Sequence, residues 1–164
     1  MEDSSNICLS CGLCCDGMLI GFVQLDPKEV PTLREVMKIE EENLFLQPCD
    51  KYCDGCTIYA ERPANCIKFK CGLLKSVEQK KLTFDSAVNT IELAKEKRSA
   101  IEEQITALNL NLRSQSFYFK MVELNKILHS PKFDSHQAAE KHKIISNIRE
   151  LEELIIEKFD LSFT

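Results

Sequence analysis

The placement of the cysteines constrains this chain more than any other feature of its sequence. All 9 cysteines lie between Cys8 and Cys71, and residues 72–164 contain none. A chain of 164 residues buries about two-thirds of its unfolded surface on folding, so it forms a core without cross-links. The cysteines therefore exceed what packing requires. Their distribution predicts two parts, a cysteine-rich module over residues 1–75 and a cysteine-free region over residues 76–164.

The first residues do not resemble an export signal. Residues 1–6 are acidic and polar, whereas a signal peptide begins with basic residues. The longest apolar run, residues 18–23, is far too short to cross a membrane. We therefore expect a cytoplasmic protein with no membrane partner, in which thiols stay reduced. Clustered cysteines in that compartment indicate metal ligands before they indicate disulfides.

The charge of the module argues against a nucleic-acid partner. Residues 1–75 carry 8 basic and 12 acidic side chains, and residues 76–164 carry 13 and 14. Nucleic-acid-binding modules usually present a basic face, because contacts to phosphate supply most of their affinity. Thiolates would make the module still more negative. We therefore expect no nucleic-acid partner.

The spacing of the cysteines is typical of sites for soft metals. The chain reads Cys8-x2-Cys11-x2-Cys14-Cys15, followed by Cys49, Cys53, Cys56, Cys66 and Cys71. Zinc takes four thiolates in a tetrahedron. A [4Fe–4S] cluster also takes four, and ferredoxins supply them as Cys-x2-Cys-x2-Cys with one distant cysteine. The first block matches that cluster spacing, with the distant ligand among the later cysteines. The predicted cofactor is therefore an iron–sulfur cluster, [4Fe–4S] by its spacing, or zinc.

Two details of the first block bear on the number of sites. Gly12 lies inside a Cys-x2-Cys step and relieves the backbone there. Neighbouring side chains diverge, so Cys14 and Cys15 serve either different ions or different edges of one site. Eight of the 9 thiolates would fill two four-coordinate sites.

Two stretches of the module resemble a known family. Cys8-Leu-Ser-Cys11-Gly-Leu-Cys14-Cys15 looks like the signature of the CxxCxxCC, or YkgJ-type, cysteine-cluster family of zinc- or iron-chelating proteins. Residues 56–71, CTIYAERPANCIKFKC, are similar to that family's C-x-IY-x2-RP-x2-C-x2-F-x-C pattern. The resemblance covers residues 8–73. It implies a shared set of metal ligands: Cys8, Cys11, Cys14, Cys15, Cys49, Cys56, Cys66 and Cys71.

Three further expectations come from the same resemblance. Cys53 departs from the family pattern and is either a spare thiol or a substitute for a shared ligand. Arg62 either donates hydrogen bonds to metal-bound sulfur or, with Pro63, only shapes the turn between the flanking cysteines. A flagellin lysine methylase has a similar cysteine motif, so the resemblance also implies an enzymatic relative.

The pattern of the module predicts one strand and one helix. Residues 17–25 read as a short strand with a bend at Gly21. Asp26 and Glu29 flank a helix start, and that helix should run to about residue 38. The remaining cysteines should lie on loops and short strands.

The second region predicts helices. Apolar residues at helical spacing indicate helices over residues 85–110 and 117–128, the latter ended by Pro131. A third helix should begin at Asp134. Its apolar stripe is Ile144, Ile148, Leu151, Ile155 and Phe159. The predicted fold class is α+β: a small irregular cysteine-rich metal-binding module, then a helical hairpin or three-helix part. That part packs on itself, on the module or on a partner, including a second copy.

No separate catalytic apparatus is visible in the sequence. The three histidines are His129, His136 and His142, and their spacing indicates exposed surface positions rather than metal ligands. Phosphate-binding glycine loops and nucleophile elbows are also missing. The sequence leaves open whether the chain is an enzyme. It predicts a metal-binding protein, in metal handling or electron transfer. The alternatives are a metal- or cluster-dependent modifying enzyme and a zinc-stabilised interaction module.

Overall fold

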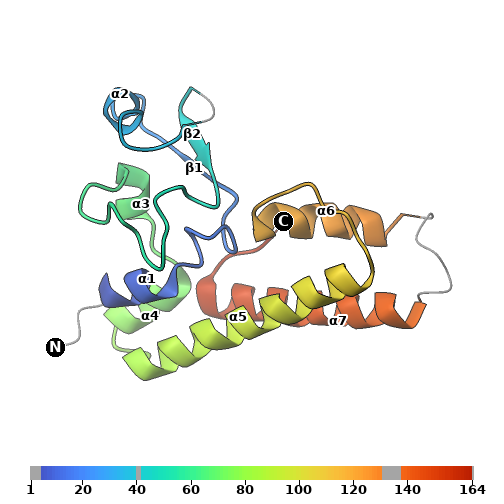
Figure 1. Cartoon of the computed structure of the whole chain (residues 1–164). Coiled ribbons are helices and arrows are strands. Elements are labelled where there is room, and N and C mark those ends of the chain that lie inside the picture. Colours follow the sequence, from blue (N-terminus) through green and yellow to red (C-terminus); the bar gives the residue numbers. More distant parts are fainter. Residues whose placement is uncertain (1–4, 40–41, 131–137, 164) are drawn as a thin grey trace.

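The computed structural model describes residues 5–39, 42–130 and 138–163. An N-terminal half of short elements lies against a C-terminal half of long helices (Figure 1). The first half contains α1 (Ser5–Cys11), β1 (Phe22–Gln24), α2 (Val30–Leu33), β2 (Leu44–Leu46), α3 (Ala64–Lys68) and α4 (Gly72–Glu78). The second half contains α5 (Phe84–Ala107), α6 (Phe117–Leu128), α7 (Ala138–Leu154) and η2 (Ile155–Phe159), a π-helical turn. The predicted α+β class with a helical C-terminal part is confirmed.

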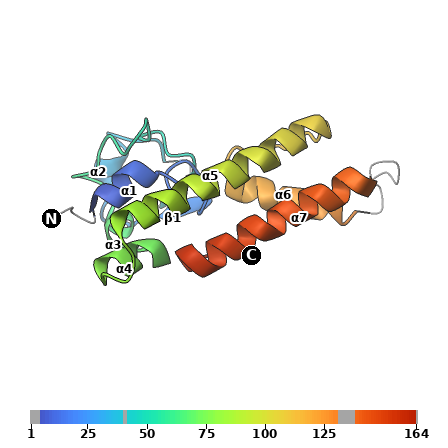
Figure 2. The same cartoon turned by 90° about the horizontal axis from the view of Figure 1, so that it is seen from below.

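The predicted helices of the second half are confirmed over the described residues. Thr83 caps α5 by accepting from the backbone N–H of Ser86, and Ser116 caps α6 by accepting from that of Phe119. Helices α5 and α7 run side by side (Figure 2). The predicted cap at Asp134 lies outside the described residues. Among the helices described, none has the length and apolar character needed to cross a membrane.

The larger hydrophobic core joins the two halves. Core 1 is built from the buried faces of α5, α6 and α7, and residues of the N-terminal half enter it. The residues that enter are Ile7, Leu13, Met18, Leu19 and Leu73. Helix α1 contacts α5, and α4 contacts η2. The cysteine loop that follows α1 is thus anchored on the helical half.

A smaller core lies inside the module. Core 2 consists of Val23, Leu25, Val30, Leu33, Met37 and Phe45. Strands β1 and β2 pair antiparallel, with Val23 opposite Phe45 on the buried face. Phe22 and Leu46 pair on the other face, where each is more than two-fifths exposed, at 49% and 44%.

The predicted strand over residues 17–25 is much shorter in the structure. Only residues 22–24 are extended, and Gly21 forms the predicted bend. Residues 13–19 form turns instead, because the backbone N–H groups of Met18 and Leu19 both donate to the carbonyl of Leu13. The turn that carries the cysteines therefore extends into the residues predicted as strand.

The predicted helix over residues 26–38 is wrong in its length. The start is also displaced. Asp26 accepts from the backbone N–H of Lys28 and Glu29 accepts from that of Asp26, as in a helix cap, but residues 27–29 form a turn and the helix begins at Val30. Only α2 is helical, however, and turns follow it. Pro31 has no N–H to donate to the carbonyl of Pro27, so a helix that began at Pro27 would lack this bond, whereas Pro31 is tolerated in the first turn of α2. Helices α1, α3 and α4 are not among the predicted elements.

Candidate metal centre

All the cysteines in the family pattern line one cavity. The cavity has a volume of about 480 Å³ and lies between α1, β1, α3 and the start of α4. The lining cysteines are Cys8, Cys11, Cys14, Cys15, Cys49, Cys56, Cys66 and Cys71. Cys53 is exposed and is not one of the described residues that line it. All 9 cysteines are free thiols.

The first cysteine block is a helix followed by a tight turn. Cys8 and Cys11 lie on α1, and Gly12 ends the helix with a φ of 66°. A side chain at Gly12 would collide with the ring of Tyr52, so the position also permits a close approach between the two segments. Cys14 and Cys15 lie in the turn that follows. The first cysteine block is therefore half helix and half turn.

Each later cysteine is positioned by a different piece of local structure. Cys49 donates its backbone N–H to the carbonyl of Cys15 at 2.8 Å. Cys56 forms a β-bridge with Tyr52. Cys66 lies on α3, and Cys71 is the N-terminal cap residue of α4. The regular local backbone structure around each of these cysteines therefore holds its thiol at the cavity.

The thiols interact electrostatically in two sets. Burial raises the pKa of Cys14 well above its usual value, and Cys11, Cys71, Cys15 and Cys8 raise it further. Burial also raises the pKa of Cys8, with Cys71 as the next contribution. Cys8, Cys11, Cys14 and Cys71 are therefore near neighbours, and we call them quartet A.

The other four thiols form the second set. Burial raises the pKa of Cys15 to about 12, and Cys56, Cys49 and Cys66 add to it. Burial likewise raises the pKa of Cys66 to about 12, with Cys49 and Cys56 next. We call Cys15, Cys49, Cys56 and Cys66 quartet B. The interaction between Cys14 and Cys15, which are adjacent in sequence, links the quartets.

Packing divides the cysteines in the same way. Cys11, Cys14 and Cys71 of quartet A pack against core 1. Cys49 and Cys66 of quartet B pack against core 2. Packing therefore separates these five thiols along the same division, three on core 1 and two on core 2.

Basic side chains lie close to the thiols. Burial raises the pKa of both Cys8 and Cys66, and the charge of Arg62 opposes that rise at each, so Arg62 acts on a thiol of each quartet. Its guanidinium donates to the carbonyl of Tyr59 at 2.7 Å and lies 3.7 Å from the centre of the Tyr59 ring. Lys95 of α5 lowers the pKa of Cys11. Both of the roles expected of Arg62 are compatible with this position.

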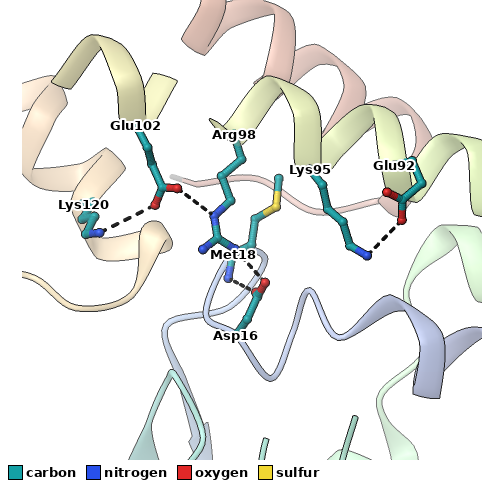
Figure 3. A network of polar contacts seen from close by, with 7 residues as sticks. All are labelled: Asp16, Met18, Glu92, Lys95, Arg98, Glu102 and Lys120. Atoms are coloured by element: carbon teal, nitrogen blue, oxygen red, sulfur yellow. Dashed lines mark hydrogen bonds and ion pairs between the residues drawn. The ribbon is translucent and has the colours of Figure 1, made fainter. Parts of the chain in front are cut away.

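An ion-pair network fastens the cysteine loop to the helical half (Figure 3). Asp16, directly after Cys15, accepts from Arg98 of α5 at 2.6 Å and from the backbone N–H of Met18 at 2.9 Å. Arg98 also pairs with Glu102 at 3.5 Å, and Glu102 pairs with Lys120 of α6 at 3.7 Å. The network was not predicted. Its signal in the sequence is Arg98, a charged residue in the middle of the apolar stripe of α5.

The donor chemistry of the cavity fits a soft metal or an iron–sulfur cluster. Thiolates are the ligands that zinc and iron–sulfur clusters share. Their raised pKa values keep Cys11, Cys15 and Cys66 protonated near neutral pH, so metal binding would displace protons. No three His, Cys, Asp or Glu side chains among the described residues are close enough together to hold a metal ion. Coordination would therefore require the side chains to turn further into the cavity.

His129 and His142 do not line this cavity. His129 and His142 are exposed, as expected, and a ring nitrogen of His129 lies 2.8 Å from the carbonyl of Asn125. His136 lies outside the described residues.

No family model, no curated protein and no solved structure matches the chain significantly. The resemblance to the cysteine-cluster family therefore stays a prediction that rests on the cysteine pattern.

Proposed function

We propose that this chain binds metal, as an iron–sulfur cluster or as zinc, through the eight cysteines that line the cavity. One observation carries the proposal: the cysteines of the pattern all border the cavity, while Cys53, the departure from the pattern, is exposed outside it. If the cysteines formed disulfides or only filled the core, nothing would require the eight to line the cavity while Cys53 lies outside it. Metal handling and electron transfer are the roles that such a site serves.

The order of the ligands favours a cluster for at least part of the site. Cys8, Cys11 and Cys14 have the Cys-x2-Cys-x2-Cys spacing of cluster proteins, and Cys71 supplies the distant fourth thiol. Zinc would occupy the same thiols where a labile cluster has been lost, because soft thiolate sites accept it readily. Anaerobic purification followed by iron, zinc and acid-labile sulfide analysis therefore identifies the bound species. We expect a brown protein whose visible absorption bleaches on reduction.

Serine substitution tests the ligand set itself. Cys11→Ser and Cys66→Ser should each lower the metal content, because each removes a thiol that lines the cavity. Cys53→Ser is the matched control and should keep the full metal content. Wild-type protein that contains no stoichiometric metal, after anaerobic purification with iron, sulfide and zinc supplied, would overturn the proposal. A loss of metal in Cys53→Ser equal to that in Cys11→Ser would overturn the choice of ligands.

A further inference from the structure

We infer that quartet A and quartet B are two separate metal sites, each closed by its own four cysteines, rather than one centre with shared thiolates. The inference rests on the proposed function and adds to it the number of sites and the ligands of each. Four thiolates complete the coordination of one zinc ion or one cubane cluster. Each quartet supplies that number without borrowing a ligand from the other.

The first argument is where the quartets are anchored. Cys11 and Cys14 pack on core 1, together with Cys71 at the start of α4. Cys49 and Cys66 pack on core 2, which contains no residue of α5, α6 or α7. Two separate cores therefore hold these five thiols, and a single centre would have to draw ligands from both.

The second argument is the geometry at Cys14 and Cys15. The carbonyl of Cys14 accepts from Gly17 at 3.3 Å, within the turn that returns the chain to core 1. The carbonyl of Cys15 accepts from Cys49 at 2.8 Å, which ties Cys15 to the module. The two backbone units thus belong to different parts of the fold. The interactions of the thiols agree with this: Cys14 interacts first with Cys11 and Cys71, whereas Cys15 interacts with Cys56, Cys49 and Cys66.

Metal stoichiometry in paired variants tests the division. The purified chain is stripped of metal under reducing conditions and reconstituted with Zn²⁺ alone. We expect about two Zn²⁺ per chain in the wild-type protein, because each ion takes four thiolates. Cys8→Ser and Cys49→Ser should each retain about one. Cys53→Ser should retain the wild-type amount.

Double variants separate one shared centre from two independent ones. Cys8→Ser/Cys71→Ser, both within quartet A, should bind as much Zn²⁺ as Cys8→Ser alone. Cys8→Ser/Cys49→Ser, across the quartets, should bind almost none. Co²⁺ absorption gives a second readout, because the remaining site should show an unchanged tetrathiolate spectrum in each single variant.

The outcomes distinguish this inference from the proposed function. Wild-type protein that takes up no metal would sink both. Wild-type protein that binds metal, with single variants of either quartet losing all of it, would leave the proposed function standing and overturn the division. This conclusion holds whether or not the variant keeps its helical circular dichroism. If the two sites are independent, loss of one ligand should not empty both of them.

Discussion

At the scale of single residues, Asp16 connects the cysteine loop to the helical half. Arg98 and Asp16 lie 82 positions apart in the sequence and form a 2.6 Å ion pair. Their side chains are only 25% and 19% exposed, so solvent screens this pair less than it screens a surface pair. Asp16 directly follows Cys15, and the pair therefore fixes the segment that supplies a thiol to each quartet.

Arg98→Met should weaken both the fold and the metal site. The substitution keeps much of the side-chain volume but leaves the Asp16 carboxylate partly buried without its partner. We expect a loss of about 1–3 kcal/mol in the free energy of unfolding. For a chain of this size, each kcal/mol lowers the melting temperature by about 2–4 °C. Metal should also pass from the Arg98→Met variant to a competing chelator faster than it does from the wild-type protein. Thermal denaturation and stopped-flow chelation measure the two effects.

The neighbouring residue supplies the matched control. Lys97 pairs with Glu150 at 2.8 Å, but these side chains are 28% and 54% exposed. Lys97→Met should therefore cost less than about 1 kcal/mol and leave the rate of metal release unchanged. Equal effects of the two substitutions would show that the Asp16 pair has no special role in holding the loop.

At the scale of elements, the packing of α4 against η2 positions Cys71. Gly72 follows Cys71 and begins α4. A Cβ at Gly72 would lie 3.0 Å from the carbonyl carbon of Phe159 and 3.1 Å from the backbone nitrogen of Asp160. Both atoms are backbone, so they cannot turn aside as a flexible side chain would. The close approach between these two elements therefore requires glycine.

Gly72→Ala should consequently displace the N-terminus of α4 and the thiol next to it. We expect overpacking to cost about 1–3 kcal/mol and to reduce metal retention at quartet A more than at quartet B. The control is Lys75→Ala, which removes an exposed 3.7 Å ion pair to Asp160 between the same elements. It should shift the melting temperature little. Unchanged stability and metal content in Gly72→Ala would contradict the positioning role.

The C-terminal helices were predictable because their signal is local. Apolar residues recur at helical spacing, and serine or threonine caps precede α5 and α6. The residues Asp26 and Glu29 predict a helix over residues 26–38, but Pro31 has no N–H to donate to the carbonyl of Pro27, so no helix continues from that cap. Helices α3 and α4 are short, with five and seven residues, and present too little periodicity to be read from the sequence.

The candidate site was predictable only in its list of residues. The cysteine pattern selected the thiols that line the cavity, and it set Cys53 apart. The division into quartets could not be predicted, because it depends on tertiary contacts, such as the packing of Cys11, Cys14 and Cys71 on core 1 and of Cys49 and Cys66 on core 2. The ion pair between Asp16 and Arg98 was equally hidden, since no local pattern links residues so distant in sequence.

At the scale of the whole molecule, the two cores differ in size. Core 1 contains twenty buried hydrophobic residues of the described chain, and core 2 contains six. Fifteen of the twenty lie in residues 84–163, so the helical half has the larger core of its own. We therefore expect metal binding to stabilise mainly the module.

Metal removal should accordingly loosen the two halves to different extents. Chelation under reducing conditions should increase amide exchange most in β1, β2 and α3, which depend on core 2 and quartet B. Helices α5 and α7 should keep most of their protection, because their contacts lie in core 1. Helix α1 should respond to an intermediate degree, since Ile7 packs on core 1 while Cys8 and Cys11 lose their metal. Hydrogen exchange followed by mass spectrometry measures all three segments in one experiment. Readdition of Zn²⁺ is the control and should restore protection in the module. Equal loss of protection in both halves would mean that the module and the helices fold as one cooperative unit, and the dependence on core size argued above would be wrong.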